Sequence, residues 1–158
     1  AVNGVAAGAG ASLALCCDII VASENASFLQ AFSKIGLIPD SGSTYFLPRQ
    51  VGMQRAAALM MTAEPISAYE AEKMGMIYKV YPQDEFEKES WNLVSKLSKM
   101  PTKALSLTKK LLNSSQENSL EEQLNLEDRY QSIAASTEDF KEGVKAFLEK
   151  RKANFKGM

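Results

Sequence analysis

Residues 36–46, "GLIPDSGSTYF", place a lone carboxylate, Asp40, between apolar residues and a Ser-Gly-Ser sequence. Asp at such a position is a good N-cap for a helix that follows. A carboxylate beside Ile38 and Pro39 would also be partly desolvated, and desolvation favours the neutral form, so the group can both accept and return a proton. The two roles are compatible, and this segment alone does not choose between them.

Residues 4–10, "GVAAGAG", are rich in glycine, which suggests a nucleotide-binding loop. The dinucleotide pattern G-x-G-x-x-G counted from Gly8 fails at Leu13, and no Gly-Lys-Ser/Thr follows as a P-loop requires. What remains is a strand, a turn of small residues and the start of a helix, whose free backbone N–H groups can hold an oxygen that becomes negative. Close helix packing would require the same small residues, so both interpretations stay open.

The chain contains no histidine, which excludes imidazole bases and His-containing zinc sites within it. Cys16 and Cys17 are adjacent in an apolar segment, where cysteines are more often core residues than a disulfide or a metal site. Ser12 and Cys16 have no base within reach, so neither is assigned a nucleophilic role. We expect carboxylates, hydroxyls or backbone groups to carry any chemistry, with no metal.

Composition indicates a soluble, globular protein: 46% of the 158 residues are hydrophobic, 23% are charged, and no apolar run approaches the ~20 residues of a membrane span. We expect a cytoplasmic protein with no membrane partner. The opening "AVNG" has neither an initiator Met nor a signal peptide, so we expect a cut or processed chain.

The net charge of −1 hides an asymmetry, because residues 141–158 carry six Lys/Arg and two Glu. A basic tail on an acidic body suggests a small anionic ligand before it suggests nucleic acid. The tail "AFLEKRKANFKGM" is either a solvated basic helix end or a phosphate clamp.

Local patterns predict an α/β region followed by helices alone. We expect a helix over 11–17, strands over 18–23 and 26–30, and helical structure from Asp40 to about Met61, interrupted near Pro48 and Gly52. Capping boxes are predicted at Ser67 with Glu70 and at Ser119 with Glu122. From residue 84 onward the apolar spacing is helical throughout.

Four segments, taken in order, resemble the enoyl-CoA hydratase/isomerase (crotonase) family: "AVNGVAAGAGASLALCCDIIVAS", "FSKIGLIPDSGSTYFLPRQVG", "ISAYEAEKMGMIYKVYP" and "EGVKAFLEKRKANF". Family members are longer, and the resemblance covers only their C-terminal part. It implies that residues 1–98 form the end of a ββα spiral core, and that residues 99–158 form helices that mediate trimerisation and contact coenzyme A. Coenzyme A would be part of the substrate, and no separate cofactor is implied.

The resemblance also assigns roles to residues. It places one oxyanion-hole N–H on Ala9, with Gly8 and Gly10 letting the thioester approach, and it places Ser12 and Phe32 where family hydratases carry two water-activating glutamates. Phe32 would then be an apolar wall of the substrate pocket.

The acid of family isomerases falls on Asp40, while Phe147 and Lys150 fall on the residues that reach coenzyme A. We therefore expect Asp40 to move a proton, with any capping secondary, in an acyl-CoA isomerase that assembles as a homo-trimer or hexamer. The implied reaction is a 3-enoyl to 2-enoyl shift, or conversion of a ring-epoxidised phenylacetyl-CoA to its oxepin, in fatty acid or phenylacetate metabolism. The alternatives are an enoyl-CoA hydratase and a non-catalytic acyl-CoA-binding or assembly fragment.

Overall fold

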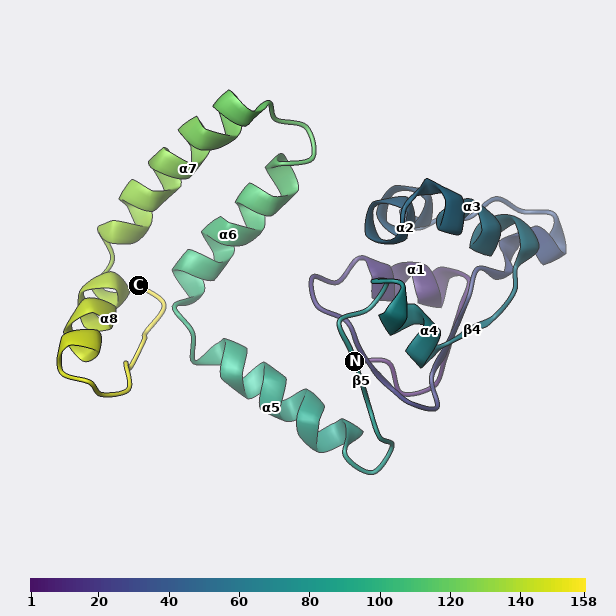
Figure 1. Ribbon diagram of the computed structural model, residues 1–158, viewed down its shortest axis with the longest axis horizontal. Coiled ribbons are helices and arrows are strands. Elements are labelled where there is room, and N and C mark those ends of the chain that lie inside the picture. The colour runs from purple at the N-terminus through teal and green to yellow at the C-terminus, as the bar shows by residue number, and fades with distance from the viewer. The chain divides into compact units, whose positions relative to one another are not determined.

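The computed structural model describes all residues 1–158, which divide into a first unit, Ala1–Trp91, and a second unit, Asn92–Met158. Figure 1 shows the elements of each unit in chain order. The first unit contains β1 (Val5–Ala7), α1 (Ala9–Leu15), β2 (Val21–Ser23), β3 (Ser27–Leu29), the 3-10 helix η1 (Ala31–Ile35), α2 (Ser43–Val51), α3 (Met53–Thr62), β4 (Ile66–Ser67), α4 (Ala68–Lys73) and β5 (Lys79–Tyr81). Helix α5 (Phe86–Ser98) contains the division between the units, and α6 (Thr102–Ser114), α7 (Leu120–Ala135) and α8 (Glu138–Leu148) follow it.

Two small sheets organise the first unit. In one sheet β1 pairs parallel with β3, in the register Ala6 to Phe28, and β3 pairs antiparallel with β4. In the other sheet β2 pairs parallel with β5, in the register Ala22 to Val80. Parallel pairs require crossover connections, and here α1 and α4 lie in those connections. The result is the mixed α/β arrangement that the sequence predicts.

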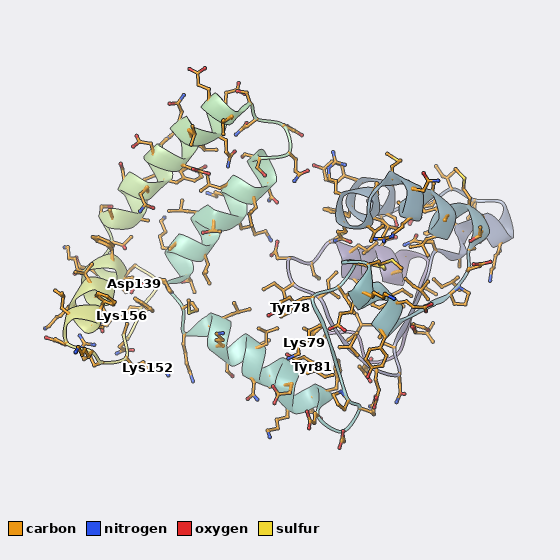
Figure 2. The ribbon with its side chains drawn as sticks, viewed as in Figure 1. Tyr78, Lys79, Tyr81, Asp139, Lys152 and Lys156 are labelled. Atoms are coloured by element: carbon orange, nitrogen blue, oxygen red, sulfur yellow. The ribbon has the colours of Figure 1, made fainter.

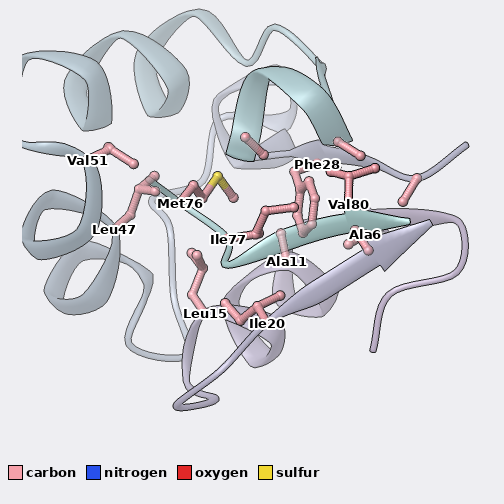
Figure 3. Packing of buried hydrophobic residues seen from close by; sticks show 14 of the residues in the cluster. Ala6, Ala11, Leu15, Ile20, Phe28, Leu47, Val51, Met76, Ile77 and Val80 are labelled. Atoms are coloured by element: carbon pink, nitrogen blue, oxygen red, sulfur yellow. The ribbon is translucent and has the colours of Figure 1, made fainter. Parts of the chain in front are cut away.

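One apolar cluster holds the first unit together (Figure 3). Helix α1 contributes Ala11 and Leu15, β3 contributes Phe28, and α2 contributes Leu47 and Val51. Burial of these side chains removes apolar surface from water, which is the main favourable term in folding. The cluster thereby fixes α1 and α2, which follow the two predicted site segments.

The predicted elements are present with shifted bounds. Helix α1 begins at Ala9, two residues before the predicted start, because Gly8 makes the turn that ends β1. The helical stretch after residue 40 is two helices, α2 and α3, separated at Gly52, where φ is +83°. Both capping boxes are confirmed, and in each the Ser backbone N–H bonds the Glu carboxylate and lowers the pKa of Glu70 and of Glu122.

Helices are the only regular secondary structure of the second unit. Helices α6 and α7 pack as an antiparallel hairpin, and α7 also contacts α8 (Figure 1). None of the helices in the structure is both long enough and apolar enough to cross a bilayer. The predicted division at residues 98 and 99 falls at the end of α5 and stays a prediction.

The chain after α8 folds back along that helix, held by two carboxylates, of which Figure 2 labels Asp139. Asp139 is 3% exposed and accepts hydrogen bonds from the backbone N–H groups of Lys156, at 2.7 Å, and of Gly157, at 2.8 Å. Glu142 accepts two hydrogen bonds from the Arg151 guanidinium, at 2.6 and 2.9 Å. Bonding to Arg151, with a second contribution from the Asn154 N–H, lowers the pKa of Glu142 to about 2.

This low pKa predicts a specific response to acid. The folded-state pKa of Glu142 lies below the ordinary value of 4.5, so its stabilising effect is complete above about pH 4.5 and is lost as the pH falls toward 2. Glu142→Gln should lower the melting temperature at pH 7, and the difference from the unmodified protein should shrink between pH 4.5 and pH 2. Glu138→Gln is the control, because its ion pair with Lys141 is largely exposed and should contribute little at any pH. A carboxyl NMR titration that gave Glu142 an ordinary midpoint would contradict the assignment.

Candidate active site

Gly8 forms the turn between β1 and α1, with φ +52° and ψ −124°. This backbone conformation is open to glycine and strained for other residues. The Gly8 N–H donates to the carbonyl of Leu29 at 2.8 Å, and the Gly8 carbonyl accepts from the Ser12 N–H at 3.0 Å. Hydrogen bonds on both sides therefore hold the turn in place.

Ala9, the first residue of α1, is exposed directly after this turn. The N–H groups in the first turn of a helix have no partner inside the helix, so the Ala9 N–H is available to an oxygen of a ligand. Gly10 is exposed beside it, and a Cβ built on Gly10 would meet nothing within 4 Å. The surface at Ala9 and Gly10 is thus open, as close approach of a ligand requires.

Phe32, in η1, lies against the same turn. Its ring is 7% exposed, and a Cβ built on Gly8 would lie 3.8 Å from the Phe32 Cζ atom. The structure therefore brings the predicted residues Gly8, Ala9 and Phe32 together.

Ser12 is fully buried on α1, and its hydroxyl donates to the Gly8 carbonyl at 3.2 Å. The hydroxyl is thus engaged in supporting the turn. With serine at position 12 and a buried phenylalanine at position 32, neither of the two positions that the resemblance assigns to hydratase glutamates carries a carboxylate.

Asp40 occupies the first position of a β-turn, not a helix cap. The Ser43 N–H donates to the Asp40 carbonyl at 3.0 Å, and the two central residues, Ser41 and Gly42, have φ of +52° and +79°. Two positive φ values are the mark of a type I′ turn. The N-cap of α2 is Gly42, with no side-chain hydrogen bond, so the capping role considered for Asp40 is wrong. Its carboxylate accepts instead from the Ser41 hydroxyl at 2.9 Å.

The desolvation expected at Asp40 is also absent within this chain. Asp40 is exposed, Ile38 is 83% exposed, and Pro39 is only partly buried. The physical reason is that residues 36–40 form a surface loop, and an apolar side chain next in sequence does not shield a carboxylate unless it packs over it.

Phe147 and Lys150 lie in the second unit, at the C-terminal end of α8. Phe147 is 83% exposed and lines an apolar groove of about 470 Å³ with Val144 and Phe155. Lys150 is exposed and has φ +53°, in a helix-ending motif in which its N–H bonds the Phe147 carbonyl. Glycine is the usual residue at such a position, so a lysine there is locally strained.

Two buried polar residues near the Asp40 turn escaped sequence reasoning. The Ser43 hydroxyl donates to the Gln30 side-chain carbonyl at 2.9 Å, and both residues are buried. The only available signal was a glutamine directly after an apolar strand, which is too common to identify a partner.

Comparison with known proteins agrees with this geometry. The family model described as enoyl-CoA hydratase/isomerase matches residues 1–158. The chain belongs to the enoyl-CoA hydratase/isomerase family. The family and the crotonase-type α/β fold predicted from the sequence are thereby confirmed.

Among curated relatives, a probable enoyl-CoA hydratase of Rhodobacter capsulatus is 47% identical over 99% of this chain and 61% of its own length. The 1,2-epoxyphenylacetyl-CoA isomerase of Escherichia coli is 46% identical over 99% of this chain and 60% of its own length. The crystal structure of an enoyl-CoA hydratase from Bacillus anthracis superposes with a TM-score of 0.94 at 33% identity, over 98% of this chain and 60% of that one.

The names of these relatives do not decide which reaction this enoyl-CoA hydratase/isomerase family member catalyses. A hydratase and an isomerase are almost equally similar to it, at 47% and 46% identity. The chain spans about three fifths of the length of both relatives.

The Gly8 turn can be tested with a matched pair of substitutions. Gly8→Ala should lower the free energy of unfolding by about 1–3 kcal/mol, because alanine is strained at φ +52° and ψ −124°. Gly10→Ala should leave stability unchanged or raise it by up to about 1 kcal/mol, because Gly10 has ordinary helical geometry and open space. Urea denaturation measures both, and equal effects of the two substitutions would show that the turn conformation is not limiting.

Proposed function

We propose that the protein containing this chain is an acyl-CoA isomerase in which Asp40 is the acid/base and the Ala9 N–H is one donor of the oxyanion hole. The observation that carries the proposal is the distribution of carboxylates. The positions that the resemblance assigns to the hydratase glutamates hold Ser12 and Phe32, both buried, whereas Asp40 presents an exposed carboxylate on an ordered turn.

The proposed mechanism begins with removal of an activated proton from the acyl group by Asp40. The negative charge that develops on the thioester oxygen is stabilised by the Ala9 N–H, together with a second donor from the part of the family fold outside this chain. In a 3-enoyl to 2-enoyl shift the same carboxylate returns the proton to a different carbon. Acid-base catalysis of this kind contributes ~10²- to 10⁴-fold, and an oxyanion donor typically contributes a few kcal/mol.

Two substrates fit one acid and one oxyanion hole: a 3-enoyl-CoA, and a ring-epoxidised phenylacetyl-CoA that rearranges to its oxepin. The similarity to the 1,2-epoxyphenylacetyl-CoA isomerase, at 46% identity, supports the second. We place either reaction in the cytoplasm, within phenylacetate or fatty acid catabolism.

The coenzyme A portion of the substrate is assigned to Phe147 and Lys150. Phe147 presents an apolar ring at the groove of the second unit, and Lys150 is one of six cations among residues 141–158. An ammonium on a flexible stem serves as a point charge for a phosphate.

We further propose a homo-trimer or hexamer. The second unit exposes apolar side chains such as Leu120, Phe140 and Leu148, and exposed apolar patches often mark interfaces between proteins. Sedimentation velocity at micromolar concentration measures the assembly, and a monomer at every concentration would contradict it.

A second candidate is hydration. It is favoured by the names of relatives such as the Rhodobacter capsulatus protein and the 2,3-dehydroadipyl-CoA hydratase of Escherichia coli, which is 40% identical. A panel of enoyl-CoA thioesters distinguishes the two reactions, because double-bond migration conserves the mass of the substrate and hydration adds one water. If neither reaction occurs but coenzyme A binds, the non-catalytic alternative holds.

Asp40→Asn tests the proton-transfer role. Asparagine retains the acceptor for the Ser41 hydroxyl but cannot accept a proton at neutral pH. We expect an unchanged melting temperature, because Asp40 caps no helix, and isomerisation reduced by ~10²-fold or more. Glu64→Gln, which neutralises an exposed carboxylate of the same unit, should retain activity. Full activity of Asp40→Asn would remove Asp40 from the mechanism.

Lys150→Ala tests coenzyme A binding. We expect KM to rise about fivefold to tenfold at low salt with little change in kcat, and the effect to fade at high salt, where screening weakens the attraction of an exposed charge. Lys150→Arg keeps the charge and should stay close to the unmodified enzyme. Lys156→Ala, which removes another exposed cation of the same tail, is the matched control. A fall in kcat at constant KM would assign Lys150 to the chemistry.

A further inference from the structure

We propose that Gln30 and Ser43 form a buried positioning pair that holds the Asp40 carboxylate in place relative to the Gly8 turn. This inference rests on the proposed role of Asp40 and adds two residues that do not touch the substrate. They act through the backbone of the turn that carries the acid.

Ser43 connects the Asp40 turn to the interior. Its backbone N–H donates to the Asp40 carbonyl at 3.0 Å, which closes the turn, and its hydroxyl donates to the Gln30 Oε1 atom at 2.9 Å. Ser43 is 0% exposed and Gln30 is 4% exposed. The bond is therefore shielded from competing water, so it can specify a position more sharply than a surface hydrogen bond.

Gln30 connects the same path to the oxyanion side of the site. It follows Leu29, whose carbonyl accepts the Gly8 N–H at 2.8 Å. A path of three hydrogen bonds, with the covalent link between Gln30 and Leu29, thus runs from Asp40 to Gly8. The proposed acid stands at one end of the path, and the turn that presents the Ala9 N–H stands at the other.

The Asp40 turn needs such an anchor because its backbone is strained. Ser41 has φ +52°, which a residue with a Cβ adopts at a cost. The next residue, Gly42, has φ +79°, and a Cβ there would lie 2.9 Å from the Phe46 Cε2 atom. A strained conformation persists only where its surroundings impose it. The bond between Ser43 and Gln30 ties the end of this turn to the buried interior.

The hydrogen bonding of Gln30 argues against a role in stability alone. Its Nε2 atom is buried and has no hydrogen-bond partner within this chain. A buried donor without a partner is unfavourable, and replacing both members of such a pair by apolar groups of similar shape can leave stability nearly unchanged. The presence of the Gln30–Ser43 pair is therefore better explained by its positioning of the Asp40 turn than by a contribution to the stability of the fold.

The test uses Ser43→Ala, Gln30→Met and the double variant, each made in the unmodified full-length protein and in Asp40→Asn. With a 3-enoyl-CoA as the probe, Ser43→Ala should lower kcat for double-bond migration by ~10- to 100-fold while KM changes less than about twofold, because the acid is misplaced and the ligand still binds. The double variant should lose no more activity than Ser43→Ala. In the Asp40→Asn background Ser43→Ala should have no further effect on kcat. Thr44→Ala, which alters the exposed neighbouring hydroxyl, should leave kcat unchanged.

Amide hydrogen exchange gives a readout that does not require activity. The residue 43 N–H, which closes the Asp40 turn, should exchange about tenfold faster or more in Ser43→Ala and in Gln30→Met. Unchanged exchange in both variants would overturn the proposal. An unchanged kcat in Ser43→Ala, together with an inactive Asp40→Asn, would also overturn the proposal. That result would leave the proposed role of Asp40 intact. Full activity of Asp40→Asn would instead refute the proposed function, and with it the pair's catalytic purpose. If Ser43→Ala lowered kcat equally in the unmodified protein and in Asp40→Asn, the pair would act only in supporting the structure, and the proposal would be wrong.

Discussion

The backbone conformation of Gly8 is the constraint on which the candidate site depends. Strand β1 must end, and helix α1 must begin, within one residue, and only glycine adopts the required φ and ψ without strain. The turn is held by the Leu29 carbonyl on one side and by Ser12 on the other. Because these partners come from β3 and α1, the parallel pairing of β1 with β3 and the burial of α1 both determine where the Ala9 N–H lies.

The apolar cluster of the first unit provides the rigidity behind this arrangement. Leu15 and Leu47 are almost fully buried, so they anchor α1 and α2 in the interior. The proposed chemistry lies at the start of α1 and in the turn before α2. The loop with Ile38 is different, because its apolar side chains face solvent in this chain. A carboxylate in such a loop owes its position to hydrogen bonds of the turn, and Ser43 supplies both the backbone bond and the link to the interior.

The second unit uses carboxylates in another way. Asp139 and Glu142, three residues apart on α8, accept backbone N–H groups of the returning chain, and Glu142 also binds Arg151. Hydrogen bonds to a charged group are stronger than those between neutral groups, so two side chains are enough to order a segment without secondary structure. Lys150 lies at the start of the segment that these bonds hold. The backbone that carries its ammonium is therefore fixed for the proposed contact with an anion.

The sequence by itself determined the local features, because they depend on residues close together in the chain. The capping boxes at Ser67 and Ser119, the interruption at Gly52 and the change from α/β to helices alone follow from short-range hydrogen bonds, φ preferences and apolar spacing. Four segments in order, among them those that contain Gly8 and Asp40, were likewise enough to predict the family. Only the tertiary structure decided that Asp40 lies exposed on a turn instead of capping α2, and that Gln30 meets Ser43 in the interior. The physical reason is that burial and hydrogen-bond partners depend on which distant segments pack together, and neighbours in sequence carry no information about that.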